Sequence, residues 1–533
     1  MPTRTSPRPS RTTVEALRAR PECEVLIIGA GINGIATFRD LALNGVDVVL
    51  VDRDDYVAGA SSGSSHMIHG GIRYLENGEF RLVKESVHER NALLRLAPHY
   101  VRPLPTTIPI FSTFSSLLSA PLRFIGVKTR GKKERGALII KVGLTIYDLF
   151  SRDGGRVPRH QFRGAKASRA LLPALRRDVK WTATYYDASM HDPERLALDV
   201  LMDGVAAGDH ARASNYVEAA GMDPDGAVLL RDAITGEEFA MRARVVVNAS
   251  GPWTDLTNAA LGETSQFMGG TKGSHIVVDH PELLAACHGR EIFFEFTDGR
   301  IVLIYPLKGR VLIGTTDIAH DMAEPIRCTE EEVDYFFDVV RYVFPSIPVD
   351  RSHIVFRFSG VRPLPRLDAA STAQVSTDGR LIGGAVGSPT TPESRTAWLA
   401  AHGETVGTER AAELLERYGT SAEAIIRRIA AGQDAPLAAA PEYSRAEIAH
   451  LVETEQVVRL VDVVLRRTSL AFRGLVTDAL LTELADLIGD ALGWDAARRA
   501  QERDGARLYL ADRHGIDLTP AETTGAPSRR GKA

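Results

Sequence analysis

The sequence predicts a mixed α/β fold that is followed by a separate helical domain. Residues 24–55 run through an apolar strand, a glycine-rich turn, a helix and a second apolar strand, which is the order of a parallel βαβ unit. Short apolar runs bounded by turn residues recur up to residue 364, whereas amphipathic helical patterns replace them after residue 390. A chain of 533 residues is long enough for two or three domains, each with its own core.

Residues 24–55, EVLIIGAGINGIATFRDLALNGVDVVLVDRDD, are expected to form a Rossmann-like unit. Val25–Ile28 and Val46–Val51 are apolar runs, typical of strands that are buried on both faces of a parallel sheet. The second run ends at Asp52, whose carboxylate is placed to accept hydrogen bonds from the ribose of a bound adenosine. We therefore predict a dinucleotide-binding domain, and this unit alone does not choose between NAD and FAD.

Three glycines after the first strand, Gly29, Gly31 and Gly34, have the G-x-G-x-x-G spacing. The first two allow a tight turn and a close approach of the backbone to a pyrophosphate, and the third lets the helix pack against the strand. The N-terminus of that helix presents unpaired N–H groups and the positive end of its dipole to the phosphates. The residues predicted to bind the cofactor in this unit are Gly29, Ala30, Gly31, Asn33, Gly34, Asp52 and Arg53.

Two later segments are candidates for the remainder of a long cofactor. Ser61, Ser62, Ser64 and Ser65 follow the dinucleotide unit, so their hydroxyl and N–H groups are expected to line the cofactor, although their composition is also that of a simple polar loop. The segment RVVVNASG, residues 244–251, reads as a buried strand that ends in small residues, where the backbone passes close to a ligand. A plain core strand is the alternative. The residues assigned to the cofactor in this segment are Ala249 and Gly251.

Five motifs spread along the chain help to choose between NAD and FAD. They are SSGSSHMIHGGIRYLE (61–76), NASGPW (248–253), KGSHIVV (272–278), GTTD (314–317) and FSGVRPL (358–364). With these motifs the chain resembles the FAD-dependent glycerol-3-phosphate dehydrogenases, the respiratory type among the D-amino-acid-oxidase-like flavoproteins. The resemblance extends from residue 24 to about residue 515. An amino-acid oxidase of the same fold is disfavoured, because HGGIRYLE and SGVRPL together are not general features of that fold.

The resemblance implies a domain arrangement and an activity. An FAD-binding domain with an interleaved antiparallel-sheet substrate domain is expected over residues 23–390, and a helical domain over residues 391–516. The implied reaction is the oxidation of sn-glycerol 3-phosphate to dihydroxyacetone phosphate, with electrons passing from FAD to a quinone and molecular oxygen as the alternative acceptor. The resemblance leaves a homodimer open.

Glycerol 3-phosphate is a dianion near neutral pH, so its site needs cationic donors. By resemblance these are Arg73 and Arg362, with Tyr74 and His275 as neutral partners. Arginine stays protonated and is a poor base, so we assign Arg362 to orienting the substrate and stabilising the developing alkoxide. His69 or a bound water is expected to take the hydroxyl proton. The plainer alternatives are a structural role for His275 and a surface ion pair for Arg362.

One expected segment is missing. In the relatives, the SGVRPL segment is followed by an Arg-Asp pair, an apolar strand and a Gly-Gly-Lys-x-Thr-Thr turn whose helix faces the flavin. Here Ser376 is followed by Thr377 and Asp378, and no Gly-Gly-Lys-x-Thr turn occurs in the sequence. We therefore expect several dozen residues of the flavin domain to be absent, and Gly383 and Gly384 to be a linker. The alternative function is a non-catalytic or severely impaired paralogue, or a gene model that lacks an internal piece.

Composition excludes several other classes. The net charge of −4 gives no basic excess for a nucleic-acid partner. Cys23, Cys287 and Cys328 are too far apart for a disulfide framework or a zinc site, so no metal is expected and a reducing cytoplasm is the natural compartment. Residues 1–22 and 517–533 are expected to be a disordered leader and a disordered tail.

No segment qualifies as a transmembrane helix. Residues 103–122 come nearest, but they contain four prolines and seven Ser or Thr residues. Residues 121–141 contain seven basic residues and one acidic residue, and apolar residues resume towards residue 150. Residues 121–150 therefore form either a peripheral contact with an anionic membrane, at its inner face, or a solvated loop ahead of a core helix.

The C-terminal part of the chain is expected to consist of amphipathic helices that pack against one another. AEIAHLVETEQVVRLVDVVLRR, residues 446–467, has apolar residues at steps of three, four and seven, which predicts an amphipathic helix. Residues 408–430 and 474–512 show the same pattern.

Overall fold

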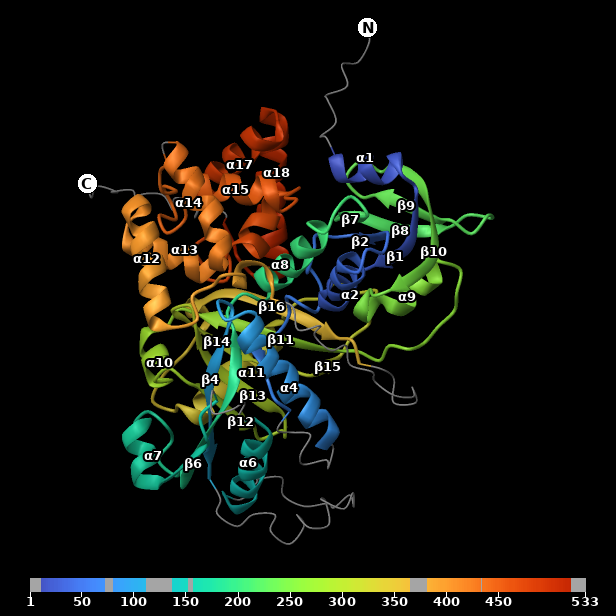
Figure 1. Ribbon diagram of the computed structural model, residues 1–533. Coiled ribbons are helices and arrows are strands. Elements are labelled where there is room, and N and C mark those ends of the chain that lie inside the picture. The colour runs from blue at the N-terminus through green and yellow to red at the C-terminus, as the bar shows by residue number, and fades with distance from the viewer. Residues whose placement is uncertain are drawn as a thin grey trace, which may run out of the picture.

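The Rossmann-like unit is part of a six-stranded sheet. In the computed structural model, which describes residues 11–71, 80–111, 137–151, 157–364, 381–432 and 434–518, this sheet has the order β7-β2-β1-β10-β9-β8 (Figure 1). The first four strands are parallel, and β9 and β8 extend the sheet in the antiparallel direction. The strands span Ala211–Ser214 (β7), Val48–Val51 (β2), Glu22–Ile28 (β1), Glu238–Asn248 (β10), Val228–Asp232 (β9) and Val217–Met222 (β8).

Apolar packing holds two helices on one face of the parallel strands. Helix α2 (Ile32–Leu43) packs against helix α8 (Pro193–Val205), and side chains such as Phe38 and Leu201 form one core with the strands. All four residues of β2 are buried, as predicted for a strand covered on both faces.

Residues 12–19, which the sequence places in a disordered leader, form helix α1 (Thr12–Ala19) instead. Val14 and Leu17 are buried in the core on the other face of the sheet. The guanidinium of Arg11 lies 3.4 Å from the carboxylate of Asp232, which fixes the start of the helix. A helix of eight residues shows only two core positions, which is too short a pattern to separate from a leader by sequence.

The second sheet is larger and mostly antiparallel. Its main path is β15-β11-β14-β13-β12-β4-β6-β3, with β16 paired to β11 and β5 paired to β6. Its strands β3–β6 lie in the sequence between β2 and β7 of the first sheet, and its strands β11–β16 follow β10, so the two domains are interleaved. The strands span Ile318–Ala319 (β15), Thr271–Val278 (β11), Arg310–Gly314 (β14), Ile301–Leu307 (β13), Glu291–Glu295 (β12), Val101–Ile110 (β4), Trp181–Met190 (β6), Met67–Ile68 (β3), Ile354–Arg362 (β16) and Gln161–Gly164 (β5).

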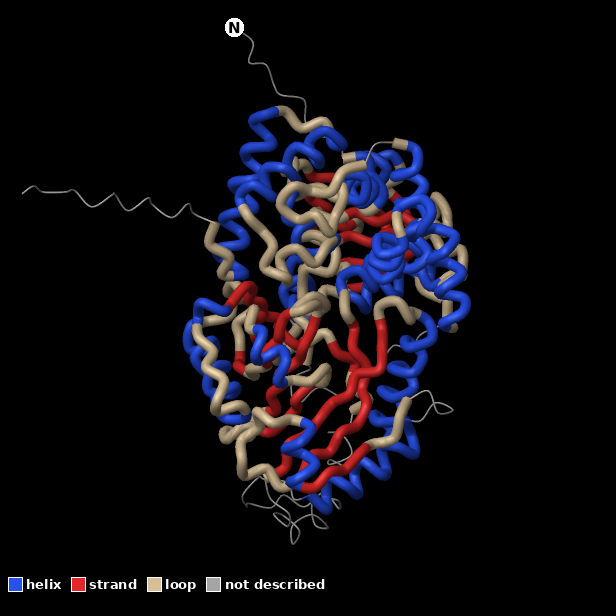
Figure 2. The backbone as a smooth tube through the Cα atoms, turned by 90° about the vertical axis from the view of Figure 1, so that its left-hand side faces the viewer, coloured by secondary structure: helices blue, strands red, loops and turns tan. Residues whose placement is uncertain are grey.

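Helices cover both faces of this larger sheet. One face packs against α10 (Pro281–Ala286) and α11 (Glu330–Val343), and the other packs against the C-terminal helices. Figure 2 shows a broad group of strands in the lower half of the molecule, with helices on either side of it and further helices above it. The other helices near the sheets are α4 (Phe80–Leu96), α6 (Ala137–Ser151), α7 (Ala165–Leu171) and α9 (Thr254–Ala260).

The C-terminal helices form a domain of their own, so the predicted α/β class with an interleaved antiparallel sheet and a helical domain is confirmed (Figure 1). The long helix predicted over residues 446–467 is wrong in detail. Helix α15 ends at Thr454, and after a break the chain continues as α16 and a π-helical turn over Val463–Arg467. The helices span Pro392–Val406 (α12), Thr408–Tyr418 (α13), Ala422–Ala431 (α14), Arg445–Thr454 (α15), Leu460–Asp462 (α16), Asp478–Leu492 (α17) and Ala496–His514 (α18).

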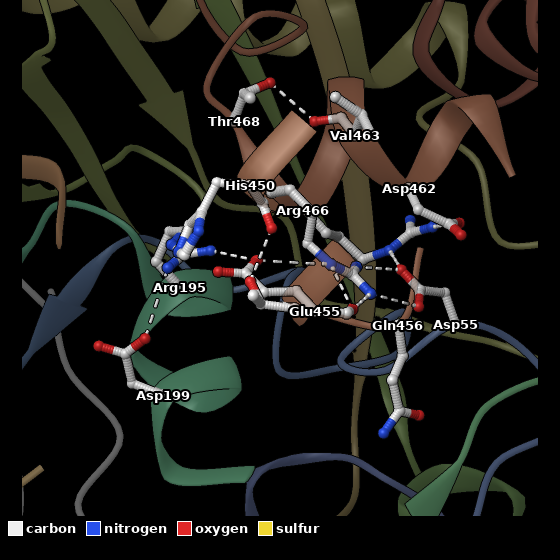
Figure 3. A network of polar contacts seen from close by, with 12 residues as sticks. Asp55, Arg195, Asp199, His450, Glu455, Gln456, Asp462, Val463, Arg466 and Thr468 are labelled. Carbon is white, nitrogen blue, oxygen red and sulfur yellow. Dashed lines mark hydrogen bonds and ion pairs between the residues drawn. The ribbon is translucent and has the colours of Figure 1, made fainter. Parts of the chain in front are cut away.

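A buried ion network explains this break. Asp55, which follows β2, accepts hydrogen bonds from Arg466 Nε at 2.5 Å and Arg467 Nη1 at 2.6 Å, and Arg466 also contacts Asp462 (Figure 3). Burial disfavours ionisation of Asp55, but the two arginines outweigh it and hold its pKa well below the usual range. The π-helical turn brings both arginines to one carboxylate, and the helical domain is thereby fixed to the loop after β2.

The expected linker at Gly383 and Gly384 is a short 3-10 turn, Gly383–Ala385, that is packed into the protein. The N–H of Gly383 donates to Asp203 at 3.0 Å, and a Cβ on Gly384 would lie 2.1 Å from the carbonyl oxygen of Tyr418. The linker is therefore docked between α8 and α13, at a point where only glycine fits.

Candidate functional site

A cavity of about 530 Å³ lies at the carboxyl ends of β1, β2 and β10, where the glycine turn leads into α2. We name it the cofactor cavity. Ligands of open α/β sheets bind at the carboxyl ends of the strands, so its position is the expected one. Nine of the predicted cofactor residues line it: Gly29, Gly31, Asn33, Asp52, Arg53, Ser61, Ser64, Ala249 and Gly251.

The geometry of the glycine turn fits a pyrophosphate. Gly29 has φ +108°, and a Cβ on Gly34 would lie 1.9 Å from the carbonyl oxygen of Gly29, so both positions require glycine. A Cβ on Gly31 would meet only Ser61 Oγ, at 3.4 Å, and would otherwise point into open space. The N–H of Ile32, the first residue of α2, donates to the same Oγ at 2.9 Å. The turn and the helix N-terminus therefore form a cradle for phosphate groups.

Asp52 and Arg53 occupy the part of the cavity expected to hold the adenosine. Asp52 Oδ2 accepts the N–H of Ala30 at 2.6 Å, and Oδ1 accepts the N–H of Asp54 at 2.9 Å. Burial raises the pKa of Asp52 to about 7, although these two hydrogen bonds act in the opposite direction. The guanidinium of Arg53 lies 4.8 Å from the ring centre of Trp253. Asp52 therefore fastens the glycine turn and also faces the cavity.

The serine loop divides its side chains between three surroundings. Ser61 and Ser64 line the cofactor cavity, whereas Ser65 contacts the larger sheet. Ser62 instead lines a second cavity, of about 500 Å³, between the loop and the helical domain, together with His66. Burial lowers the pKa of His66 to about 4, so the ring is neutral at pH 7. His66 was not predicted as a site residue, and its place in the SSGSSHMIHGG motif is the one sequence signal that points to it.

His275 lies where the serine loop meets the larger sheet. Its Nε2 is 2.8 Å from Ser65 Oγ, and its ring stacks on Phe358 with 4.7 Å between ring centres. The side chain is 2% exposed, and burial, with Arg362 and His66 adding to the effect, lowers the pKa of His275 to about 3. His275 is therefore a neutral hydrogen-bonding group beside the cofactor loop.

Arg362, the last residue of β16, is held in a defined orientation. Its Nη1 and Nη2 lie 3.4 and 3.3 Å from the carbonyl oxygen of Thr316, and Nη1 donates to Asp317 Oδ1 at 3.0 Å. The side chain is 38% exposed. The structure thus contains the ion pair that the sequence suggests as the plainer role for Arg362. The guanidinium is nevertheless partly exposed, and it lies close enough to His275 to influence the pKa of that ring.

The other substrate candidates are less well placed. His69 is exposed and lines neither cavity, and the N–H of Gly71 donates to its Nδ1 at 3.1 Å. Arg73 and Tyr74 lie outside the described residues. The base assigned by the sequence analysis, His69, is therefore not brought into a cavity.

A fully buried cluster holds the turn that leads to Arg73. Asp187 Oδ1 accepts hydrogen bonds from the N–H of Gly70 at 2.9 Å and from Tyr147 OH at 2.6 Å, and Arg90 Nη1 lies at 3.3 Å. Only Gly70 belongs to a motif. Arg90, Tyr147 and Asp187 lie far apart in segments without one, so sequence reasoning could not have found the cluster.

The first sheet ends abruptly beside the cofactor cavity. β10 pairs with β1 over residues 242–248, but with β9 only over Glu238–Met241. Among the described residues, the second edge of β10 over residues 242–248 therefore has no neighbouring strand, and Val245 is 52% exposed. The gap predicted after Ser376 falls outside the described residues.

Comparisons with known families match this architecture. The model of the family described as FAD dependent oxidoreductase matches residues 24–407, and the model of the C-terminal domain of alpha-glycerophosphate oxidase matches residues 375–499. The structure of a glycerol-3-phosphate dehydrogenase from Bacillus halodurans, complexed with FAD, superimposes with a TM-score of 0.72 at 20% identity and covers 96% of this chain and 100% of that chain. This likeness shows the fold.

Curated relatives are similar at moderate identity. A glycerol-3-phosphate dehydrogenase of Synechocystis sp. is 34% identical over 371 residues, which are 66% of this chain and 63% of that protein. The chain thus spans less than two thirds of the length of that relative. The mitochondrial glycerol-3-phosphate dehydrogenase of Bos taurus is 28% identical over 605 residues, which cover 96% of this chain and 78% of that protein.

The structure and the matched families lead to the same family assignment. On the structural side, it rests on the glycine turn, the cofactor cavity and the interleaved sheets. The predicted membership of the FAD-dependent oxidoreductases and the predicted FAD cofactor are confirmed. The chain therefore belongs to the family of FAD-dependent oxidoreductases.

Proposed function

We propose that the protein oxidises sn-glycerol 3-phosphate to dihydroxyacetone phosphate and passes the electrons through FAD to a quinone. The observation that carries this proposal is the serine loop, which lines the cofactor cavity through Ser61 and Ser64 and contacts His275 through Ser65, while the charge of Arg362 acts on His275. A dianionic substrate needs a fixed cation and neutral hydrogen-bonding groups, and Arg362 and His275 supply them. The names of the relatives support the same substrate.

When bound, FAD supplies the hydride acceptor for the C2 carbinol. Gly31, the N-terminus of α2 and Asp52 would hold its adenosine–pyrophosphate half. We assign Arg362 to the phosphate or to the developing alkoxide oxygen, and His275 to a hydrogen bond with the substrate. The proton would leave to a bound water, because His69 lines neither cavity.

The acceptor and the cellular location are part of the proposal. Within the described residues no helix is long and apolar enough to cross a membrane. Helix α6, at the end of the basic stretch, exposes Leu138 and Val142 one helical turn apart. This supports a peripheral contact of residues 121–150 with the inner face of the cell membrane, where a quinone is available to a cytoplasmic enzyme. A homodimer is compatible with this arrangement.

A second candidate, a severely impaired paralogue or a truncated gene model, is favoured by one specific observation. The uncovered edge of β10 lies next to the cofactor cavity, where the relatives are expected to carry a further strand and helix. The alignment with the bovine relative extends over 605 positions, more than the 533 residues of this chain, so this chain lacks several dozen of the aligned positions in total.

A visible spectrum of the purified protein followed by a dye-reduction assay separates the two candidates. The dehydrogenase should show flavin absorption and should reduce the dye when sn-glycerol 3-phosphate is added, but not when glycerol is added. An impaired paralogue would bind flavin and leave the dye oxidised with both compounds.

A further inference from the structure

We propose that Glu332 is a positioning residue, which sets the orientation of the Arg362 guanidinium by anchoring Thr316. The proposal rests on the proposed function, because Arg362 is the cation assigned to the substrate. Glu332 belongs to α11, carries no motif, and lies on the far side of Thr316 from Arg362.

The first step is the position of Glu332 at the start of α11. Thr329 is the N-cap of this helix, and the two residues form a reciprocal capping box: the N–H of Thr329 donates to Glu332 Oε2 at 2.8 Å. A capping glutamate ordinarily lies at the surface, but Glu332 is 2% exposed. Its carboxylate points inward, towards the turn that follows β14.

The second step is the set of contacts made by the rest of this carboxylate. Oε1 accepts a hydrogen bond from Thr316 Oγ1 at 2.6 Å, and Oε2 accepts one from Lys272 Nζ at 2.8 Å. Burial raises the pKa of the Glu332 carboxyl, but the hydrogen bonds from Lys272 and Thr316 outweigh it, and the pKa lies below the ordinary value. The group is therefore an ionised, fully engaged anchor.

The third step connects this anchor to Arg362. Thr316 Oγ1 donates to Glu332 and accepts the N–H of Ser274 at 2.9 Å, so the residue is fixed from two sides. The carbonyl oxygen of Thr316 accepts from both terminal nitrogens of Arg362, and the next residue, Asp317, accepts from Nη1. The guanidinium plane is thus defined by the carbonyl group of Thr316, and the side chain of Thr316 is fixed by Glu332.

Lys272 serves this anchor and not the substrate. Its Nζ donates to Glu332 and to the carbonyl oxygen of Arg327 at 2.6 Å, and the side chain is 7% exposed. Its charge balances the Glu332 carboxylate in the interior, which leaves Arg362 as the outward-facing cation of this cluster.

Replacing Glu332 by glutamine keeps the size of the side chain but removes its charge, so the hydrogen bonds from Thr316 and Lys272 weaken and the turn over residues 315–317 is free to shift. A displacement of about 1 Å at a substrate-orienting group lowers catalysis on the order of 100-fold. A displaced guanidinium also loses about one hydrogen bond to the charged substrate, so we expect Glu332→Gln to weaken binding of sn-glycerol 3-phosphate, measured by calorimetry on the flavin-loaded protein, by roughly 10- to 100-fold.

The chain offers a matched control for lost stability. Glu447 is also a buried capping-box glutamate at the third position of a helix, α15, with Arg410 and Arg417 as partners, but it lies in the helical domain. Glu447→Gln should lower the melting temperature at least as much as Glu332→Gln, and should leave substrate affinity unchanged. Thr316→Val should reproduce the loss of affinity, and Thr316→Ser should restore it.

A double-mutant cycle separates positioning from general damage. In an Arg362→Lys background, Glu332→Gln should change substrate affinity by less than about twofold, because its effect is transmitted by the missing guanidinium. An equal loss in both backgrounds, or unchanged affinity in the single variant, would overturn the proposal.

A crystal structure of Glu332→Gln keeps this proposal distinguishable from the proposed function. If the wild-type protein does not bind sn-glycerol 3-phosphate but the variant shows Arg362 displaced from the Thr316 carbonyl, the positioning role stands and the assigned substrate fails. An undisplaced guanidinium overturns the positioning role whatever the substrate is.

Discussion

Replacing Gly31 by valine tests whether the cofactor cavity holds the pyrophosphate of FAD. Gly31 is the N-cap of α2 with φ −74° and ψ 174°, an extended conformation that valine adopts without strain. A Cβ there meets only Ser61 Oγ, at 3.4 Å, so the protein without cofactor should fold normally. The valine methyl groups, however, would fill the space in which phosphate oxygens approach the helix N-terminus.

The expected loss follows from the contacts that are blocked. One hydrogen bond from a backbone N–H to a charged phosphate contributes about 1.5–3 kcal/mol, and the helix dipole contributes about 0.3–1 kcal/mol. Together these correspond to about 2–4 kcal/mol, or FAD binding that is roughly 30- to 1000-fold weaker. FAD titration of the apoprotein, followed by flavin fluorescence, measures this change directly.

Gly34→Ala is the contrasting variant. Its Cβ would lie 1.9 Å from the carbonyl oxygen of Gly29, so α2 must move away from β1 and folding itself should suffer. We expect Gly31→Val to keep the melting temperature of the apoprotein and Gly34→Ala to lower it. Gly31→Val protein that retains wild-type affinity for FAD would show that the pyrophosphate does not bind at the glycine turn.

Four further outcomes are expected. Arg362→Lys keeps the charge but loses the forked donors, so kcat/KM should fall roughly 10- to 100-fold while the flavin spectrum is unchanged; equal kcat/KM would leave Arg362 as an ion pair only. Asp55→Asn should lower the free energy of unfolding by about 3–5 kcal/mol in denaturant titrations, whereas Asp54→Asn at the exposed neighbour should not. Sedimentation with anionic vesicles should weaken steeply with salt if Arg123 to Lys141 contact lipid, and salt-independent sedimentation speaks against that contact. The segment that we expect to be missing after Ser376 carries an arginine, a lysine and a helix N-terminus in the relatives, and their loss corresponds to about 3–7 kcal/mol of lost stabilisation. Turnover should therefore be at least about 100-fold slower than in an intact relative, and a relative's segment inserted between Ser376 and Arg380 should restore it.

Local sequence patterns were sufficient to predict the cofactor cavity, because the residues that form its phosphate-binding part lie close together in the sequence. The strand, the glycine spacing and Asp52 lie within one βαβ unit, so their arrangement follows from sequence alone, and the cavity forms where they predict. Helix α1 was missed because only Val14 and Leu17 mark its buried face. The break after Thr454 was missed because the apolar period continues through it, while the ion network with Asp55 decides the backbone.

Only those residues of the candidate site that lie in motifs could be predicted from the sequence. His275 and Arg362 come from the KGSH and SGVRPL segments, and the structure places them near each other on β11 and β16. Asp187 and Glu332 lie in segments without a motif, 117 residues from Gly70 and 16 from Thr316, and their roles depend on contacts that only the folded chain creates.

Anaerobic reduction of the bound flavin is the sharpest test of the proposed dehydrogenase function, because it needs no external acceptor. We expect sn-glycerol 3-phosphate to bleach the visible flavin band of the wild-type protein, while glycerol and inorganic phosphate do not. Bleaching should be slower in Arg362→Lys protein that carries the same amount of flavin. A flavin-loaded wild-type protein whose band stays unchanged in saturating sn-glycerol 3-phosphate would contradict the proposed dehydrogenase function.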